Sequence, residues 1–328
     1  MKVGIGLPMK TLVPSALLSY ARRVEDGPFD SLSLGERLTY ECHDLMIALT
    51  WVAARTERIE LMTSVLCLPM HNEGVVAKQA ATLDVLSSGR FSLGVGLGGR
   101  PHDYDVSPAI WKGRAARFER QIATMRRIWN GDAPYEGTQP VGPTPFTSGG
   151  PELIIGAFAP VGLQRAGRLA DGIRSFGFTP DLQDHLDRYS VVSDSWNAAG
   201  RGGRPKLICS MNFALGPDAN DAYENHIRTY YGYDPELVAR ATTGNPPTSP
   251  EVITEILSRY ANAGVDHVVF TALTSDITGV SLDHLAEVVT TWKSRQAPGD
   301  DPILKVPVAT SAFVDTGIEF AAELPGRS

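Results

Sequence analysis

The amino-acid sequence predicts an α/β fold of the TIM (β/α)8 barrel class. Short apolar runs alternate with longer amphipathic segments along the chain, and there are eight such runs. Several of them, including VLCL, LIIG and HVVF, are apolar at consecutive positions, as strands are when helices cover both faces of a parallel sheet. Eight βα units in series close into a barrel, and 328 residues are enough for one.

Each predicted strand is a short β-like run followed by a segment of helical period. The strands span residues 3–8, 29–35, 59–68, 91–97, 151–158, 171–177, 206–215 and 266–273. The stretch 59–99 is the clearest unit, because it reads as a strand, an amphipathic crossover and a second strand. Parallel strands end on the same edge of a sheet, so residues 66–71 and 96–100 are expected to open on a shared ligand-binding edge.

The predicted helices have apolar stripes and identifiable starts. Ser15 is expected to cap the first helix and Asp44 the second, which runs to about residue 55. Later helices follow over residues 251–263 and 282–292. The apolar stripes are Leu17, Leu18, Ala21 and Val24 in the first helix, Phe118, Ile122, Met125 and Trp129 in the fourth, and Leu282, Leu285, Val289 and Trp292 in the last.

Two segments depart from a minimal barrel. Residues 132–150, rich in Pro and Gly, form an insertion before the fifth strand, and residues 216–250 form another after the seventh. Long excursions of this kind are more often lids or binding walls than accidents. Residues 1–293 are predicted to form the barrel, and residues 294–328, which have no clear period, a C-terminal extension.

Composition and charge exclude several classes of function. The net charge of −7 and a pI near 5.5 argue against nucleic acid as a partner, because such binding needs clustered Lys and Arg. No apolar run reaches the roughly 18 residues of a membrane helix, and the start MKVGIGLP does not resemble a signal peptide, so a cytoplasmic location is expected. Cys42, Cys67 and Cys209 form no metal-binding pair, and no metal site is predicted; Cys67 and Cys209 are expected to be buried.

The glycines at the end of the fourth strand have two interpretations. Gly94, Gly96, Gly98 and Gly99 resemble a dinucleotide fingerprint, which must open a helix directly. Pro101 follows at once and fits only the first turn of a helix. Packing of the strand, with room for a flat ligand at the barrel mouth, is therefore the favoured interpretation.

The segment 151–172 is a second candidate for ligand binding. A strand ends in Gly-Ala-Phe-Ala, and Pro160 stands at the expected first position of a helix. The free N–H groups of such a helix start attract a phosphate. An ordinary helix start in a barrel explains the pattern equally well.

Polar residues after the third and fourth strands form a third group. His71, at the carboxyl end of a strand, is placed to hydrogen-bond a ring or to move a proton; the alternative is a solvated loop histidine. His102 with Asp103 is a weaker candidate for an acid/base pair, because adjacent residues rarely face each other. His71 and His102 are the predicted catalytic residues.

Several of these segments together resemble the bacterial luciferase-like monooxygenase family. The resemblance covers about residues 1–293 and is most specific in the block from Thr56 to Gly98. The matching text is FDSLSLGER (29–37), the stretch 53–104, FERQIATMRRIWNG (118–131), ELIIGAFAPVGLQRAGRLADG (152–172) and AGVDHVVF (263–270).

The resemblance implies a TIM barrel, usually a homodimer, that holds FMN or the deazaflavin coenzyme F420 at the carboxyl ends of the strands. FMN-dependent members receive reduced flavin from a separate reductase and use O₂ to oxygenate an organic substrate. The cofactor carries the chemistry, and the protein supplies position, electrostatics and exclusion of water. A non-proline cis peptide commonly lies behind the ring, at the position of Ser64-Val65 here.

Carried over residue by residue, the resemblance places the cofactor among named side chains. Glu36, Arg37, Ser64 and Val65 would contact the ring, with Gly98 giving clearance. The phosphate would be bound by Arg100, Arg117 and the backbone at Gly156, Ala157, Phe158 and Val161. The sequence thus predicts an FMN-dependent monooxygenase acting on an apolar organic or natural-product substrate.

Two departures from the family pattern bear on this prediction. Phe158 replaces a hydroxyl residue that usually helps to bind the phosphate. Gly99 stands where deazaflavin-dependent dehydrogenases often carry a glutamate proton donor, which favours FMN. The alternatives are an F420-dependent dehydrogenase or reductase and a catalytically silent flavin-binding homologue.

Overall fold

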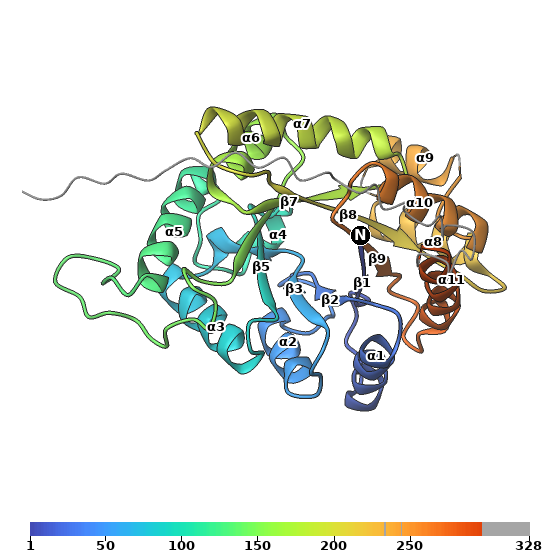
Figure 1. Ribbon diagram of the computed structural model, residues 1–328, viewed down its shortest axis with the longest axis horizontal. Helices are drawn as coiled ribbons and strands as arrows, with labels where there is room; N and C mark the ends of the chain where they lie inside the picture. Colours follow the sequence, from blue (N-terminus) through green and yellow to red (C-terminus); the bar gives the residue numbers. More distant parts are fainter. Residues whose placement is uncertain (233, 244, 297–328) are drawn as a thin grey trace, which may run out of the picture.

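A computed structural model describes residues 1–232, 234–243 and 245–296 of the chain, and it is a closed parallel barrel surrounded by helices (Figure 1). The sheet order is β3-β2-β1-β9-β8-β7-β6-β5-β4, and an additional β3–β5 pairing closes the circle. The predicted fold class is confirmed. The strands are β1 (Lys2–Gly6), β2 (Ser31–Leu34), β3 (Glu60–Thr63), β4 (Leu66–Cys67), β5 (Phe91–Gly96), β6 (Glu152–Gly156), β7 (Gly172–Gly177), β8 (Lys206–Phe213) and β9 (His267–Ala272).

The third barrel strand is divided, which corrects the prediction of one continuous strand over residues 59–68. β3 pairs with β5 at Leu61 and Phe91, and β4 pairs with the same strand at Leu66 and Val95. Between the two halves the Ser64-Val65 peptide bond is cis, as the family resemblance implied. Ser64 and Val65 thus lie between the two paired segments, where the Ser64 N–H still donates to the carbonyl of Leu34 in β2 at 2.7 Å.

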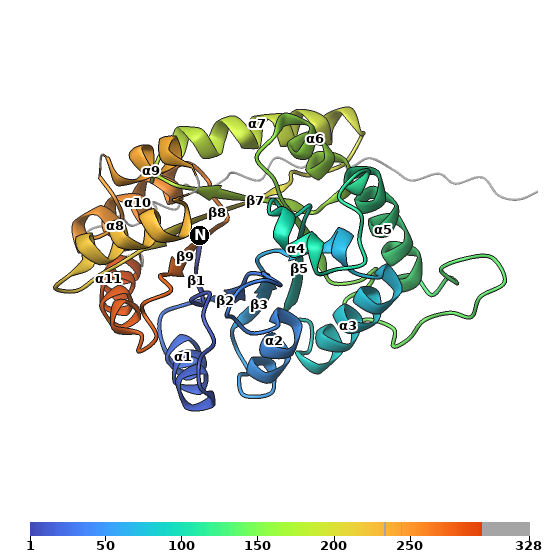
Figure 2. The same cartoon turned by 180° about the vertical axis from the view of Figure 1, so that it is seen from behind.

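Helices cover the outside of the barrel on all sides (Figure 2). The apolar stripes predicted for the fourth and last helices are buried, and Asp44 caps its helix by accepting a hydrogen bond from the N–H of Ile47 at 2.9 Å. The helices are α1 (Pro14–Asp26), α2 (Leu45–Ala53), α3 (Glu73–Leu86), α4 (Pro101–Asp105), α5 (Arg114–Trp129), α6 (Pro160–Leu169), α7 (Leu182–Ala198), α8 (Ala219–Tyr230), α9 (Pro235–Thr242), α10 (Pro250–Asn262) and α11 (Val280–Gln296), with a 3-10 turn at Leu68–Met70.

The first helix begins earlier than predicted. Val13 is its N-cap and Pro14 its first residue, so Ser15 lies inside the first turn and caps nothing. Proline fits this position because its missing N–H would have had no partner there. The stripe of α1 also shifts, since Tyr20 is buried in place of the half-buried Leu18.

The two predicted excursions lie in different places. Residues 132–150 connect α5 to β6 without regular structure and contact α3, where Lys78 donates to the carbonyl of Gly142 and Thr147 to Asp84. Figure 1 shows this loop projecting from the outside of the barrel. A connection from a helix back to a strand starts at the amino end of the sheet, so the expectation that this segment walls the ligand site is wrong. Residues 216–250 instead build α8 and α9 beside the barrel mouth.

The last helix runs to Gln296, so the predicted barrel boundary at residue 293 falls inside α11. Most of the predicted extension, residues 297–328, lies outside the described residues. Within the described ranges, no helix is long and apolar enough to cross a membrane.

Candidate functional site

The main cavity opens at the carboxyl ends of the strands and has a volume of about 750 Å³. This is within the range of small-molecule sites, about 300–1,000 Å³. Below it the barrel interior is filled by an apolar layer of Met62, Ile154, Ile208 and Val269. The predicted site residues that line the cavity are Glu36, Arg37, Ser64, Val65, Gly98, Arg100, Gly156, Ala157, Phe158 and Val161.

One side of the cavity is a glycine wall, formed by Ser64, Val65, Gly96 and Gly156; Gly94, on the same strand as Gly96, does not line the cavity. A Cβ atom at Gly94 would lie 2.0 Å from the carbonyl oxygen of Thr63, and one at Gly96 would lie 2.7 Å from a methyl group of Val65. Packing therefore explains these glycines, as predicted. Their second effect is clearance, because no side chain covers the Ser64-Val65 peptide from β5 or β6.

Glu36 and His71 form a buried pair beside the glycine wall. The Glu36 carboxylate accepts hydrogen bonds from the Cys67 N–H at 2.6 Å and lies 2.8 Å from His71 Nε2. Burial lowers the pKa of His71, but the hydrogen bond and charge of Glu36 outweigh burial and raise it above its ordinary value. Glu36 lines the cavity and His71 does not, so His71 is linked to the cavity by its contact with Glu36.

The segments after β2 and β5 meet helix α8 in a Tyr230 cluster at the mouth of the cavity, which comprises Arg37, Tyr40, Arg100, Asp103 and Tyr230. Arg37 donates to Asp103 at 2.8 Å and to the Tyr230 hydroxyl at 3.1 Å. The guanidinium of Arg100 lies 4.7 Å from the centre of the Tyr230 ring. The cluster thus ties the loops after β2 and β5 to α8.

Asp103 is the buried carboxylate of this cluster. Burial would raise its pKa, but hydrogen bonds from Thr39 and Arg37 outweigh burial and lower it. Its neighbour His102 is 86% exposed, lies outside the cavity and pairs with Asp105 at 3.4 Å. The predicted acid/base pair of His102 with Asp103 is therefore wrong, since consecutive side chains of the short α4 point to different partners.

The start of α6 faces the cavity as predicted, with Pro160 at the first position and Val161 on the lining. Arg165, one turn further on, also lines the cavity and pairs with Glu119 at 2.7 Å. Arg117 does not reach the cavity, because its guanidinium donates to the carbonyls of Pro69 and Ile110. Arg165 thus lines the cavity, whereas Arg117, which the family resemblance implied, does not.

Another part of the cavity lining is an aromatic wall, formed by Phe158, Phe176, Phe178 and Tyr231. Phe178 is its centre, with ring centroids at 6.1 Å from Phe158, 5.1 Å from Phe176 and 5.2 Å from Tyr231. Phe158, where the family usually has a hydroxyl, extends this apolar surface. No sequence pattern predicts the wall, because its members come from strand β7 and from the segments that follow β6, β7 and α8.

His226 and Arg174 line the cavity on this same side, and neither was predicted. His226 lies on the buried face of α8 with Tyr223 and Ile227, and burial lowers its pKa to about 4, so its imidazole is neutral at pH 7. Arg174 lies on β7, two residues before Phe176, and is 6% exposed. A charge inside an apolar strand, GIRSFG, is the signal that identifies it.

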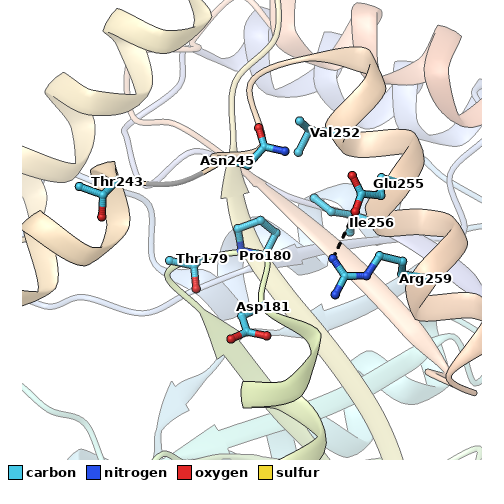
Figure 3. Close-up of a pocket in the computed structure, with 9 residues that line it drawn as sticks. All are labelled: Thr179, Pro180, Asp181, Thr243, Asn245, Val252, Glu255, Ile256 and Arg259. Carbon is cyan, nitrogen blue, oxygen red and sulfur yellow. Dashed lines mark hydrogen bonds and ion pairs between the residues drawn. The ribbon is translucent and has the colours of Figure 1, made fainter.

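A second cavity of about 320 Å³ lies between the loop before α7 and helix α10 (Figure 3). Its charged side chains have partners: Glu255 pairs with Arg259 at 3.3 Å, and Asp181 caps α7 through the N–H of Gln183. We assign no chemistry to it. Across residues 1–232, 234–243 and 245–296, no three His, Cys, Asp or Glu side chains are grouped so as to hold a metal ion.

Comparison with known proteins places this cavity in a family context. The F420-dependent glucose-6-phosphate dehydrogenase of Microbacterium testaceum is 29% identical over 297 residues, 78% of this chain and 87% of that protein. The 4-hydroxyprotoasukamycin monooxygenase of Streptomyces nodosus subsp. asukaensis is 32% identical over 229 residues, 64% of this chain and 60% of that protein.

Solved structures share the fold at lower identity. A monooxygenase from Streptomyces bottropensis superposes with a TM-score of 0.69 at 20% identity, covering 89% of this chain and 99% of that one. An F420-dependent secondary alcohol dehydrogenase in complex with an F420-acetone adduct gives a TM-score of 0.70 at 19% identity, covering 89% and 98%. The family model for luciferase-like monooxygenases matches residues 1–276. The chain belongs to the luciferase-like monooxygenase family, and it is a flavin- or deazaflavin-dependent oxidoreductase.

Proposed function

We propose that the protein is an FMN-dependent monooxygenase that uses reduced flavin and O₂ to oxygenate an organic substrate with a largely apolar body. The observation that carries this choice is Gly99. It lines the cavity where the family resemblance puts the glutamate proton donor of deazaflavin-dependent dehydrogenases, and a Cβ there would meet no atom within 4 Å. The position is open and carries no acid.

The residues of the cavity fit an FMN molecule. The glycine wall leaves a flat surface at Ser64-Val65 against which a tricyclic ring can lie. The start of α6, with Arg100 and Arg165 on the cavity lining, offers N–H groups and positive charge to a phosphate. Bound reduced flavin supplies the electrons that activate O₂, and the aromatic wall excludes water from the reacting atoms.

An F420-dependent dehydrogenase is the second candidate, favoured by the similarity to the Microbacterium testaceum enzyme. Oxidation of an alcohol by hydride transfer also releases a proton, so it requires a base at the substrate. His226 is suited to that role, because it lines the cavity and its imidazole is neutral at pH 7.

Binding and reoxidation experiments distinguish the two candidates. The purified chain is titrated with FMN, reduced FMN and F420, and the complex with reduced FMN is then mixed with O₂ in a stopped-flow instrument. We expect tighter binding of reduced FMN than of F420 and a transient absorbance during reoxidation that free FMN lacks. Preferential binding of F420 without that transient would favour the dehydrogenase, and binding of none of them would contradict both.

Gly99→Glu adds a sharper comparison. The open space at this position predicts that the variant folds with an unchanged melting temperature. If the chain is a monooxygenase, the added carboxyl group gives no alcohol dehydrogenase activity with F420 but lowers the yield of the transient. An increase in F420 affinity together with alcohol oxidation would indicate a dehydrogenase framework.

We also propose that the protein is a homodimer that receives reduced flavin from a separate reductase. Exposed apolar side chains on the adjacent helices α2 and α3, Ile47 and Val75, support a protein contact there. Light scattering on the purified chain tests the dimer, and Ile47→Asp is expected to yield monomer. A dimer that survives this substitution would refute the interface.

A further inference from the structure

Arg174 is a buried cation for which the described part of the chain provides no partner. It lines the cavity from β7, and its Nη1 atom has no hydrogen-bond partner. Among the described residues, 1–232, 234–243 and 245–296, it makes no hydrogen bond or ion pair. Burial lowers the pKa of its guanidinium to about 9, which still leaves it charged at pH 7.

Other charged groups of the cavity are already engaged. Arg37 is paired with Asp103, and Arg165 with Glu119. The carboxylate of Glu36 is held by His71 and the Cys67 N–H. Among the described residues, the carboxylates that line the cavity are therefore committed elsewhere, which leaves a ligand to supply the counter-charge for Arg174.

The surroundings of Arg174 indicate what kind of ligand this is. Its neighbours in register are Gly156 and Ile208, which provide no charge, and Phe176 follows on the same face of β7. Thr271, which also lines the cavity, has a buried hydroxyl without a partner. The N–H donors of one guanidinium can satisfy a planar monoanion, whereas a phosphate dianion needs more donors.

We propose that Arg174 binds the carboxylate of a substrate whose flat apolar body packs on the aromatic wall. The inference rests on the proposed function, because the acid is the molecule that would be oxygenated. A planar fork of N–H donors matches a carboxylate with two parallel hydrogen bonds, and lysine lacks this geometry. The class of substrate is thus an aromatic or similarly flat organic acid.

Binding of 2-naphthoate and its neutral analogue 2-naphthamide, measured by calorimetry on the protein without flavin, tests the proposal. We expect the wild type to prefer the carboxylate by about tenfold or more, and Arg174→Met to abolish the preference. Arg174→Lys keeps the charge and retains part of the preference. Arg127→Met makes the same change at an exposed position on α5 and serves as the control, with no expected effect.

The folding of the variant is measured at the same time. Without ligand, Arg174→Met should melt at a higher temperature than the wild type, since methionine removes an uncompensated buried charge. A preference for naphthoate that persists in Arg174→Met, or an equal loss for both probes, would overturn the proposal. So would loss of FMN affinity with the naphthoate preference intact, because the guanidinium would then serve the cofactor.

The outcome of the naphthoate experiment can be interpreted whether or not FMN is the cofactor. If wild type binds no FMN but Arg174→Met still loses the naphthoate preference, the proposed function fails and the acid-binding role of Arg174 stands.

Discussion

The two sides of the cavity satisfy their charged groups in different ways. On the side built from the loops after β2 and β5, Glu36, Arg37 and Asp103 are held by protein partners before any ligand arrives. On the side built from β7, Arg174 has no partner among the described residues, and the nearby surface is aromatic. The first side is preorganised around the barrel mouth. The second is completed only by what binds to it, and it is the side on which substrate selectivity is expected to depend.

The largest effect should come from breaking the preorganised side. Asp103→Asn removes the negative charge that holds Arg37 and weakens the links to Thr39, so we expect a loss of about 3 kcal/mol in the free energy of unfolding. Urea denaturation measures it. The matched control is Asp105→Asn, whose carboxylate is 69% exposed, with an expected change below about 0.5 kcal/mol. Equal losses of unfolding free energy in the two variants would contradict the claim that this side of the cavity is preorganised by Asp103.

The glycine wall gives the next effect. In Gly96→Val the new side chain meets Val65 and fills the surface at Ser64-Val65, so FMN affinity should fall about a hundredfold. Quenching of flavin fluorescence measures the affinity. Gly99→Ala, where the added methyl group meets nothing within 4 Å, should bind FMN as the wild type does. Unchanged binding in Gly96→Val would mean that the ring lies elsewhere.

The assignment of the phosphate position is tested by Arg100→Ala. A charge-assisted contact contributes about 1.5–3 kcal/mol, so FMN affinity should fall by about tenfold or more while riboflavin affinity stays nearly constant. Arg117→Ala is the control, because its guanidinium lies outside the cavity and the ratio of the two affinities should not change. If Arg100→Ala weakens both ligands equally, its role is to hold Tyr230 and not the phosphate.

The smallest effect is the pH dependence of the Glu36–His71 pair. The folded protein raises the pKa of His71 above its ordinary value of 6.5. The stabilisation of the folded protein by this pair is therefore fully present below pH 6.5, and it is lost as the pH rises through the raised pKa of His71. Wild type should exceed His71→Gln in unfolding free energy by about 1 kcal/mol or less at low pH, and the difference should disappear at high pH. A difference that grows with pH would have the wrong sign.

The fold was predictable from local patterns, and the site only in part. Hydrophobic periodicity predicted the strands and the apolar faces of α5 and α11, because the buried face of each element is determined by its own sequence. The family resemblance added the cis peptide at Ser64-Val65. It was less reliable for single side chains: Arg117 has the right charge, but its neighbours Pro69 and Ile110 take its hydrogen bonds.

The residues of the aromatic wall were not predicted, because only the closure of the barrel brings them together. Phe158, Phe178 and Tyr231 are far apart in sequence and follow different strands, and no spacing rule connects them. Arg174 was visible as a charge within an apolar strand, but only the arrangement of side chains shows that its Nη1 atom has no hydrogen-bond partner in the described part of the chain. His226 looked like part of an ordinary amphipathic helix, which it also is.

The loop 132–150 forms a surface on the outside of the barrel that is separate from the cavity. It lies against α3, contributes no residue to the cavity and carries Phe146, which is largely exposed. Insertions or deletions in this loop can change the surface contacts of the protein without changing the cavity in which the substrate binds. Evolution can therefore change this surface, and the contacts that it makes, separately from the catalytic cavity. For the same reason, an experimenter can attach a fluorophore at the tip of the loop.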